Sequence, residues 1–337
     1  MMGASDWRPT LSAVNELSTR LEQTGLLTGA IESGFLMRCR EKTTAAELAR
    51  ATGLGPDLVD NVCEALRSIG VLSSDEGGQV VISDLYAPLL DGGLDRRALD
   101  RLTAASVRAT MFRELFNGKP SSYWSIDTTS RLALAANATG DPETEFGREG
   151  MLATVRADPD WHEAFASGAR FLDLGCGIAG AIVSFLHTYP QLTAVGIDIA
   201  DDVLEVARTR ARALGVADRA TFHNADATSY RDPDPFDVVF WPQTFYPEPS
   251  RADALATVYA NLRPGGLLVT PIAPPPPDTD HPTDGRALEP LLRAMWGIRE
   301  RSFEQVRTEL AGAGFVEITA AAPLPPVLPL IKAHRPA

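Results

Sequence analysis

The chain has 337 residues, more than one compact domain normally needs, and two domains are therefore expected. Hydrophobic residues make up 45% of it and charged residues 22%, a composition typical of folded globular proteins that excludes a disordered chain. The formal net charge of −13 disfavours a nucleic-acid partner, because an acidic surface repels a phosphate backbone.

The sequence has neither an apolar run long enough to span a membrane nor a basic-then-apolar start, so no membrane span and no export signal are expected. Its three cysteines, Cys39, Cys63 and Cys176, lie far apart and form no C-x-x-C pair. This cysteine usage is typical of the reducing cytoplasm and predicts no metal site.

Residues 24–90 form the first predicted module. Thr44 and Glu47 have the spacing of a capping box, in which each side chain bonds the free backbone N–H of the other residue at the start of a helix. Pro56 suits the first turn of a second helix, and "VLSSDEGGQVVIS" predicts two short strands around a turn. Two helices followed by a hairpin predict a winged helix.

The second helix of this module is acidic. It carries Asp57, Asp60 and Glu64 against a single basic residue, Arg67. A helix that reads DNA needs basic side chains near the phosphates, so this charge favours a dimerisation role over DNA binding.

Amphipathic patterns predict further helices at Leu94 to Phe116, Ser130 to Ala138 and Glu145 to Val155. Aromatic residues concentrate between or after them, in "SSYWSID" and "DPDWHEAF". From residue 169 onward, strand-like apolar runs alternate with helices, which predicts a parallel α/β sheet.

The stretch "DLGCGIAG", residues 173–180, joins a short buried strand to a helix. Gly175, Gly177 and Gly180 form the pattern G-x-G-x-x-G, whose glycines let the backbone turn sharply and approach a ligand. The start of the helix offers unpaired N–H groups to a negatively charged group. This pattern by itself fits a dinucleotide and S-adenosylmethionine (SAM) alike.

Asp173, two residues before the first glycine, distinguishes between the two possible cofactors. Beside a pyrophosphate its carboxylate would repel the phosphates, whereas it attracts the α-ammonium group of the methionine part of SAM. The pattern D-x-G-x-G therefore predicts SAM in preference to a dinucleotide.

Polar residues also end the next two predicted strands. Asp198 ends "LTAVGID" and is placed to accept hydrogen bonds from ribose hydroxyls. Asn224 and Asp226 follow the strand "ATFH", where a carboxylate can accept from the exocyclic amine of adenine.

With these motifs, residues 170–336 resemble a class I SAM-dependent methyltransferase. "FDVVFW" resembles its fourth strand, "LRPGGLLVTPI" its fifth, and "ELAGAGFVEITAA" the helix and sixth strand. With the predicted winged helix in front, the chain resembles the small-molecule O-methyltransferase family. The resemblance implies an α/β, Rossmann-like methyltransferase sheet behind a mostly helical N-terminal winged-helix domain. It divides the chain into a dimerisation domain at 1–95, a helical linker and substrate-pocket region at 96–168, and a SAM-binding domain at 169–337.

The resemblance also implies a cofactor site and a partner. It implies that SAM binds, that S-adenosylhomocysteine (SAH) is the product, and that the N-terminal module joins two subunits into a homodimer and roofs the substrate pocket. The charge, the lack of a long apolar run and the cysteine spacing predict no nucleic-acid, membrane or metal partner. The residues assigned to the cofactor are Asp173, Gly175, Gly177, Asp198, Asn224, Asp226, Ala227 and Trp241.

Methyl transfer to oxygen usually requires a base, which in this family is a histidine after the fourth strand. Tyr246 falls at or near that position, and Thr270 stands where the first flanking glutamate of the family would be. Glu300 keeps the position of the second glutamate. The histidine mechanism of the family therefore does not transfer to this chain. Nitrogen and electron-rich carbon, which need less activation, stay open as acceptors beside oxygen.

Three residues remain as catalytic candidates: Tyr246, His162 and Glu300. His162, just before the first strand of the sheet, fits either a base near the methyl group or a packing histidine. Tyr246 fits either a partner or base for the substrate or an aromatic packing residue. The other histidines are interpreted as structural: His187, His223, His281 and His334.

Apolar and aromatic residues predict the acceptor site. Gln243 and Phe245 fall at the carboxyl end of the fourth strand, where open parallel sheets bind ligands. The helical segments before the sheet contribute Met111, Tyr123, Trp124 and Met151, each of which also fits a core position. The predominance of apolar groups predicts a neutral or aromatic acceptor.

These observations predict a homodimeric, cytoplasmic, SAM-dependent methyltransferase that acts on a small, aromatic natural product at carbon, oxygen or nitrogen. Two alternatives stay open. One is a relative that keeps SAM but performs non-methylating chemistry, and the other is a SAM-sensing winged-helix regulator. A dinucleotide-dependent dehydrogenase is disfavoured by Asp173.

Overall fold

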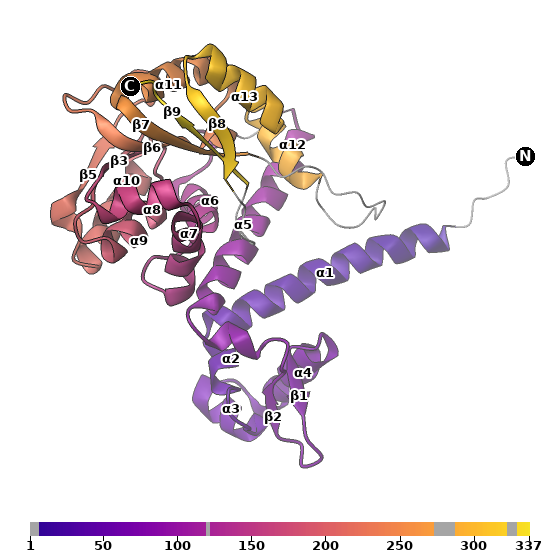
Figure 1. The fold of residues 1–337 in the computed structure, drawn as a ribbon. Helices are drawn as coiled ribbons and strands as arrows, with labels where there is room; N and C mark the ends of the chain where they lie inside the picture. Colours follow the sequence, from indigo (N-terminus) through magenta and orange to yellow (C-terminus); the bar gives the residue numbers. More distant parts are fainter. Residues whose placement is uncertain (1–6, 119–121, 273–286, 322–328) are drawn as a thin grey trace, which may run out of the picture. The chain divides into compact units, whose positions relative to one another are not determined.

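The computed structural model describes residues 7–118, 122–272, 287–321 and 329–337 (Figure 1). By its internal contacts the chain divides into two compact units, Met1–Thr103 and Ala104–Ala337. The boundary lies within helix α5 (Leu94–Leu115), which therefore contributes residues to both units.

The N-terminal unit is mostly helical. Before α5 it contains α1 (Arg8–Glu32), α2 (Phe35–Arg38), α3 (Ala45–Thr52), α4 (Pro56–Ser68), β1 (Leu72–Ser74), β2 (Val80–Ile82) and the 3-10 helix η1 (Ala87–Leu90).

The predicted capping box at the start of α3 is confirmed. The Glu47 amide donates to Thr44 Oγ1 (3.3 Å), and the Thr44 amide donates to Glu47 Oε2 (2.9 Å). Gly53 ends this helix in the left-handed region, with φ of 74°, and Pro56 begins α4. Strands β1 and β2 then pair antiparallel, as the sequence predicts. Both helices and the hairpin share one core that contains Leu48, Val59, Leu66, Val71, Val80 and Ile82.

The C-terminal unit combines helices with one large sheet. Its helices after α5 are α6 (Thr128–Thr139), α7 (Glu145–Ala157), α8 (Pro159–Ala166), α9 (Gly180–Thr188), α10 (Asp201–Ala213), η2 (Ala217–Arg219), η3 (Gln243–Phe245), α11 (Glu248–Asn261), α12 (Leu288–Met295) and α13 (Phe303–Gly312). Its strands are β3 (Arg170–Leu174), β4 (Thr193–Asp198), β5 (Ala220–Asn224), β6 (Phe236–Phe240), β7 (Leu262–Pro271), β8 (Val316–Ala321) and β9 (Leu330–His334).

The strands of this unit lie in the order β5-β4-β3-β6-β7-β9-β8. The strands from β5 to β7 pair parallel, and β9 runs antiparallel to both β7 and β8. The chain builds outward from β3 in one direction through β4 and β5, and then in the other through β6 and β7. The carboxyl ends of β3 and β6 therefore flank the switch point at which open α/β sheets bind ligands. The predicted parallel α/β sheet is confirmed.

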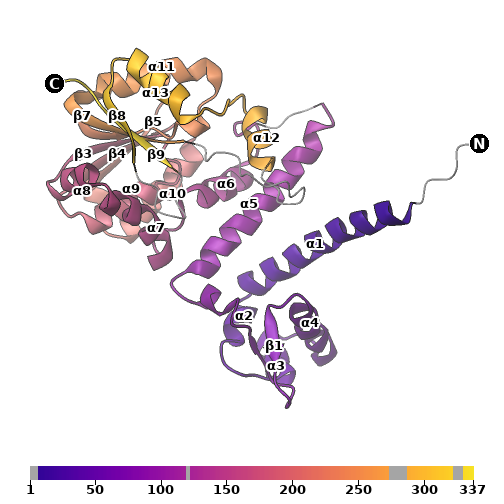
Figure 2. The same ribbon diagram turned by 45° about the vertical axis from the view of Figure 1, so that its right-hand side comes forward.

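Helices cover both faces of the sheet. Figure 2 shows α8, α9 and α10 on one face, and α11 and α13 on the other. Side chains along β3 alternate between the two cores, with Phe171 facing α8 and α9 and Leu172 facing α11. Gly196 on β4 permits the close approach of α9, since a Cβ there would lie 2.7 Å from Ile182 Cδ1.

A smaller apolar cluster joins the helices that precede the sheet to α12. Met111 of α5 and Leu292 of α12 are buried in it, and Tyr123 and Trp296 pack against it. An ion pair between Arg108 and Glu289 (2.6 Å) links the same two helices. The cluster places part of α5 beside α12.

One segment differs from its interpretation as an aromatic stretch between helices. Residues 159–166 form helix α8, because Asp158 accepts a hydrogen bond from the Trp161 amide (3.1 Å) and Pro159 suits the first turn. Trp161 and Phe165 are buried against the sheet. In the part of the chain that the structure describes, no helix is both long and apolar enough to cross a membrane.

Candidate functional site

The glycine turn joins β3 to α9 at the switch point. Gly175 and Gly177 have φ values of 91° and 53°, in the left-handed region that favours glycine. The amides of Gly175 and Cys176 both donate to the Ile197 carbonyl, at 2.8 and 2.9 Å, which fixes the turn to the end of β4. A Cβ on Gly175 would lie 3.6 Å from the Tyr246 hydroxyl. The turn is therefore fixed by β4 and lies beside Tyr246. Its backbone can come close to a ligand at the carboxyl end of the sheet.

Asp173, the last residue but one of β3, is a buried carboxyl group. It is 4% exposed, and its Oδ1 has no hydrogen-bond partner among the described residues. Burial, together with the negative charge of Asp198, raises the pKa of Asp173 to about 8. A buried carboxyl group without a partner is costly, and a bound cation that donates hydrogen bonds would relieve that cost.

Asp198, at the end of β4, supports the same turn. Its Oδ2 accepts from the Gly177 amide and its Oδ1 from the Ala200 amide, both at 2.9 Å. Burial raises the pKa of Asp198, and these backbone hydrogen bonds oppose the rise. Each carboxylate oxygen has capacity for a further hydrogen bond, so Asp198 can hold the turn and accept from a ligand hydroxyl together.

The end of β5 brings a third carboxylate to this edge of the sheet. Asn224 donates from Nδ2 to the Ile199 carbonyl (2.9 Å), which joins the ends of β4 and β5. Asp226 is exposed, and its Oδ1 accepts from the amide (2.8 Å) and hydroxyl (2.7 Å) of Thr228. Ala227 packs on the core below. Asp226 Oδ2 is thus available for a donor from a ligand.

The residues after β6 divide into buried and exposed ones. Trp241 is fully buried beneath the Arg251 guanidinium, which lies 4.9 Å from the centre of its ring. Gln243 is 3% exposed and donates from Nε2 to the Pro271 carbonyl (2.7 Å). Phe245, in contrast, is 53% exposed. Trp241 thus packs in the core on the α11 side of the sheet, and Gln243 is bonded to the end of β7.

Tyr246 supports the start of the glycine turn through a hydrogen bond to β3. Its hydroxyl is buried and donates to the Leu174 carbonyl (2.9 Å). Burial raises the pKa of Tyr246 well above its usual value, and the nearby Asp173 carboxylate raises it further. The phenol keeps its proton at neutral pH, so the interpretation of Tyr246 as a base does not fit its environment.

His162 lies at the end of the sheet opposite the glycine turn. Its Nδ1 is 2.8 Å from the hydroxyl of Tyr189, which follows the end of α9. Arg219, just before β5 begins, donates to the Tyr189 carbonyl (3.0 Å). These contacts place His162 near the amino ends of the strands, away from the glycine turn.

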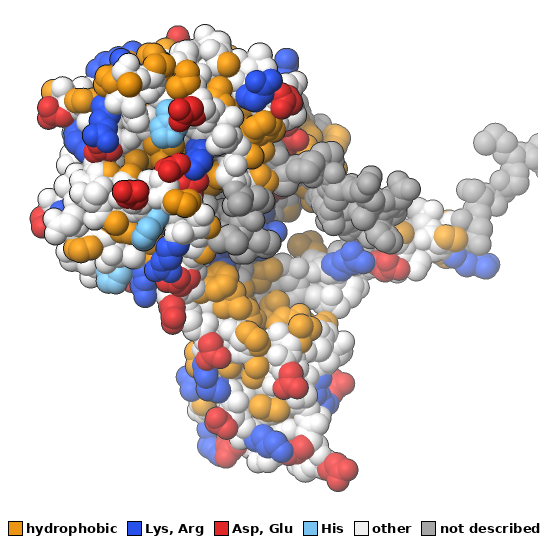
Figure 3. All heavy atoms as spheres, viewed as in Figure 1, with side chains coloured by type: hydrophobic (Ala, Val, Ile, Leu, Met, Phe, Trp, Pro, Cys, Tyr) orange, Lys and Arg blue, Asp and Glu red, His pale blue; other side chains and the backbone are white. Residues whose placement is uncertain are grey.

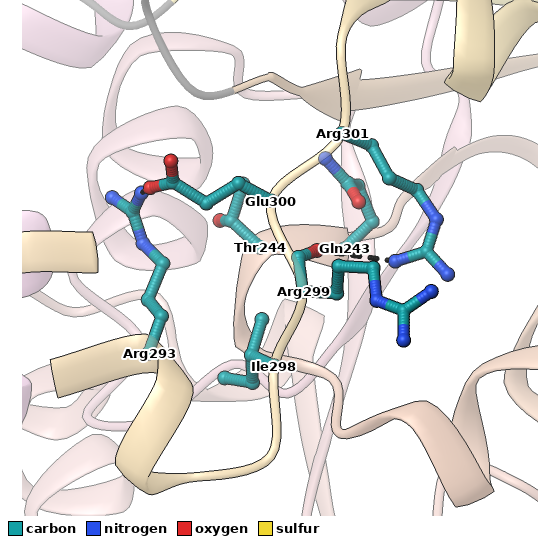
Figure 4. Close-up of a pocket in the computed structure, with 7 residues that line it drawn as sticks. All are labelled: Gln243, Thr244, Arg293, Ile298, Arg299, Glu300 and Arg301. Atoms are coloured by element: carbon teal, nitrogen blue, oxygen red, sulfur yellow. Dashed lines mark hydrogen bonds and ion pairs between the residues drawn. The ribbon is translucent and has the colours of Figure 1, made fainter. Parts of the chain in front are cut away.

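Glu300 lies on the loop between α12 and α13, and it forms an ion pair with Arg293 (Figure 4). It lines a cavity of about 10 Å³, which holds about one water molecule. The Thr270 hydroxyl is fully buried and donates to the Trp241 carbonyl (2.6 Å). Besides Glu300, the residues that line the cavity are Gln243, Thr244, Arg293, Ile298, Arg299 and Arg301.

The expected acceptor residues lie in three different environments. Met111 and Tyr123 share the apolar cluster beside α12, and the rings of Tyr123 and Trp124 pack edge to face, with centres 5.1 Å apart. Trp124 is 54% exposed. Met151 packs instead against the core between the sheet and α7 to α9, away from this cluster. The sequence analysis missed Trp296, whose ring centre is 5.8 Å from that of Tyr123, because α12 carries no recognisable motif.

A groove of about 410 Å³ runs beside this cluster, between α5 and the turn that leads into α6. Its size is in the range of small-molecule sites. Apolar side chains and hydroxyl groups line most of it, and two carboxylates complete the lining. The residues are Ser106, Val107, Thr110, Met111, Glu114, Ser125, Ile126, Asp127 and Ser130.

Residues 171–266 match the family model described as a methyltransferase domain. Among curated proteins, Methyltransferase GfsG from Streptomyces halstedii is 35% identical over 105 residues, which make up 31% of this chain and 37% of that protein. The chain therefore spans little more than a third of the length of this relative.

Solved structures resemble nearly the whole chain. An O-methyltransferase family protein from Burkholderia thailandensis matches with a TM-score of 0.74 at 16% identity, over 97% of this chain and 98% of that one. Human N-acetylserotonin methyltransferase in complex with SAM matches with a TM-score of 0.70 at 16% identity, over the full length of both chains. At this identity the likeness shows the fold. The resemblance to class I methyltransferases and the fold class that it implies are confirmed.

Proposed function

We propose that this chain, which carries a methyltransferase domain on a class I methyltransferase fold, transfers a methyl group from SAM to a small aromatic acceptor. The observation that carries the proposal is the buried carboxyl group of Asp173, whose Oδ1 has no partner among the described residues and lies at the glycine turn. An ammonium group is a cation that can donate to it, as the methionine part of SAM would.

The residues at this edge fit the rest of the cofactor. Gly175 and Gly177 give the turn its left-handed backbone, and a Cβ on Gly177 would project into open space, so the backbone there is open to a ligand. Asp198 would accept from ribose hydroxyls, and Asp226 from the adenine amine. When bound, SAM supplies an electrophilic methyl group on a sulfonium ion. The chain itself contributes alignment and the exclusion of water.

An acceptor of small aromatic type is supported by the groove and the rings beside it. The groove is large enough for a ring system, and Tyr123, Trp124 and Phe245 offer aromatic surface near the carboxyl ends of the strands. Human N-acetylserotonin methyltransferase in complex with SAM has the same fold.

The environments of the three catalytic candidates favour an acceptor that needs little deprotonation. Tyr246 keeps its proton, His162 lies at the other end of the sheet, and Glu300 is engaged by Arg293. Electron-rich carbon and nitrogen are nucleophilic without a strong base, and oxygen stays open if the acceptor is acidic. A relative that binds SAM but performs other chemistry is the alternative within the same fold.

The proposal includes a cytoplasmic homodimer formed through the N-terminal unit, and the division of the chain at residues 95 and 168. Helix α1 and the residue before it carry a row of exposed apolar side chains that a second subunit would cover: Trp7, Leu11, Val14, Leu17 and Leu21. The three cysteines are free, as in a reducing compartment.

The acidic charge of α4 counts against a SAM-sensing regulator. Arg67, the basic residue of the helix, forms an ion pair with Glu64. Acidic and basic side chains are interspersed on the face of the N-terminal unit seen in Figure 3. Such a surface offers little attraction to a phosphate backbone.

Calorimetric titration of the full chain with SAM, SAH and NAD tests the cofactor. We expect SAM and SAH to bind with the micromolar affinity common for enzyme substrates, and NAD to give no heat of binding. Asp173→Asn is expected to weaken SAM binding, whereas Asp218→Asn, an exposed residue of η2, should not change it.

Transfer itself is tested with methyl-labelled SAM and a panel of indoles, phenols and aromatic amines. Label in a small aromatic product supports the proposal. Binding of SAM with no transfer to any acceptor class would favour the non-methylating alternative, and a gel shift with promoter DNA would favour the regulator.

A further inference from the structure

Arg131, on the first turns of α6, links three groups that lie near the cofactor site. Its guanidinium donates to the Ile126 carbonyl (2.9 Å) and lies 5.8 Å from the centre of the Tyr123 ring. Its Nε is 3.4 Å from Oδ2 of Asp202. One side chain thus organises the turn before α6 and ties that turn to α10.

Asp202 anchors the other side of this link. It lies in the first turn of α10, four residues after Asp198, and its Oδ2 also accepts from the Thr128 hydroxyl (2.9 Å). The start of α6 is therefore held against the start of α10 by two contacts to one carboxylate oxygen. Both side chains of the ion pair are largely buried, with 14% of Arg131 and 23% of Asp202 exposed, so the pair is shielded from solvent more than a surface pair.

The Arg131 side chain contacts the ring of Tyr123 and so helps to fix its position. The ring packs edge to face against Trp124 on one side and Trp296 on the other, with centres 5.1 and 5.8 Å away. Burial raises the pKa of the Tyr123 phenol, and the negative charge of Asp198 raises it further. Through Arg131 the ring is linked to Asp202 at the start of α10, shortly after the carboxylate of β4 that we assign to the ribose.

We propose that Arg131 and Asp202 are positioning residues that hold the Tyr123 ring over the nucleoside end of the cofactor and so set how long the cofactor stays bound. This inference rests on the proposed function. Apolar packing of α6 on Ala200 and Val203 also joins the two helices, and the ion pair together with the Thr128 hydrogen bond adds the polar contacts that fix the start of α6. Without the ion pair, the turn before α6 would leave the cofactor site more often, and the cofactor would dissociate faster.

The test uses the full chain and SAH. Wild type, Arg131→Met, Asp202→Asn and the double variant are compared by calorimetry and by stopped-flow tryptophan fluorescence, with Arg156→Met as the matched control. Arg156 also pairs with a carboxylate on a helix surface, Glu149 of α7 (2.7 Å), but lies outside the site.

We expect each single variant to bind SAH about tenfold more weakly, chiefly through faster dissociation, and the double variant to be no weaker than the worse single variant. Asp202→Asn keeps an oxygen that can accept from the Thr128 hydroxyl. This variant therefore shows the effect of losing the ion pair while the local hydrogen bond is kept. Equal affinity and dissociation rate in all variants, or strictly additive losses, would overturn the inference.

A second comparison distinguishes positioning from general stability. In a Tyr123→Leu background, Arg131→Met is expected to have no further effect on SAH dissociation, because the ring it positions is gone. A full tenfold loss in that background would overturn the role of Tyr123. If wild type itself binds no SAH, the proposed function fails; if wild type binds and the variants match it, only this inference fails.

Discussion

The buried carboxyl group of Asp173 makes the free protein less stable as the pH rises. In the unfolded chain this carboxyl group has the usual pKa of 3.8, whereas in the fold its pKa is about 8. Below pH 4 both states carry the proton. Between pH 4 and pH 8 the folded state keeps the proton that the unfolded state has lost, so each pH unit lowers the free energy of unfolding by about 1.4 kcal/mol.

Asp173→Asn replaces this group with a neutral one of the same shape and removes that dependence. The free energy of unfolding of wild type relative to the variant should therefore fall by about 4 kcal/mol between pH 5 and pH 8. Urea unfolding of the cofactor-free protein at each pH unit measures the difference. Asp218→Asn, an exposed carboxyl group of η2, serves as the control, and its curve should run parallel to that of wild type. A constant offset between wild type and Asp173→Asn would refute the burial argument.

Three further variants test the other parts of the site. Gly175→Ala places a Cβ in the left-handed region and should lower SAM affinity at least tenfold by calorimetry, with a cost in stability of about 1–2 kcal/mol; unchanged binding would show that the turn tolerates a side chain. Tyr246→Phe loses the hydrogen bond to the Leu174 carbonyl, so the free energy of unfolding should fall by about 1 kcal/mol. The pH dependence of the transfer rate should keep its shape. A variant whose rate no longer rises with pH would show that Tyr246 is the base. Phe245→Ala should raise the KM for the aromatic acceptor and leave the Kd for SAH unchanged, and the reverse pattern would place Phe245 at the cofactor.

Local sequence signals predicted the elements well because each depends on residues close together in the chain. The capping box of Thr44, the proline at the start of α4 and the glycines after β3 all appear where they are expected. Strands β3, β4, β6 and β7 are also predicted, because parallel strands buried on both faces are rich in apolar residues.

The side to which a residue turns was harder to predict. Trp241 and Gln243 lie at the predicted edge of the sheet, but Trp241 packs in the core on the α11 side, and Gln243, at the start of η3, is bonded to the Pro271 carbonyl. Sequence indicates the edge at which such residues lie and not the direction of each side chain, because the bend after β6 depends on tertiary packing.

The position of His162 could have been predicted from topology. A residue shortly before the first residue of a strand lies near the amino end of that strand, and ligands in open α/β sheets bind at the carboxyl ends. His162 precedes β3 by eight residues and belongs to a helix that packs on the sheet. The contacts among Arg131, Asp202 and Tyr123, in contrast, join segments about 70 residues apart with no motif of their own.

A crystal structure of the full chain with SAH tests the central claim most directly. We predict that the amino group of SAH lies within hydrogen-bond distance of Asp173, directly or through one water molecule, and that its ribose hydroxyls donate to Asp198. SAH bound elsewhere, or bound at the glycine turn with both carboxylates left without contact to it, would contradict the account.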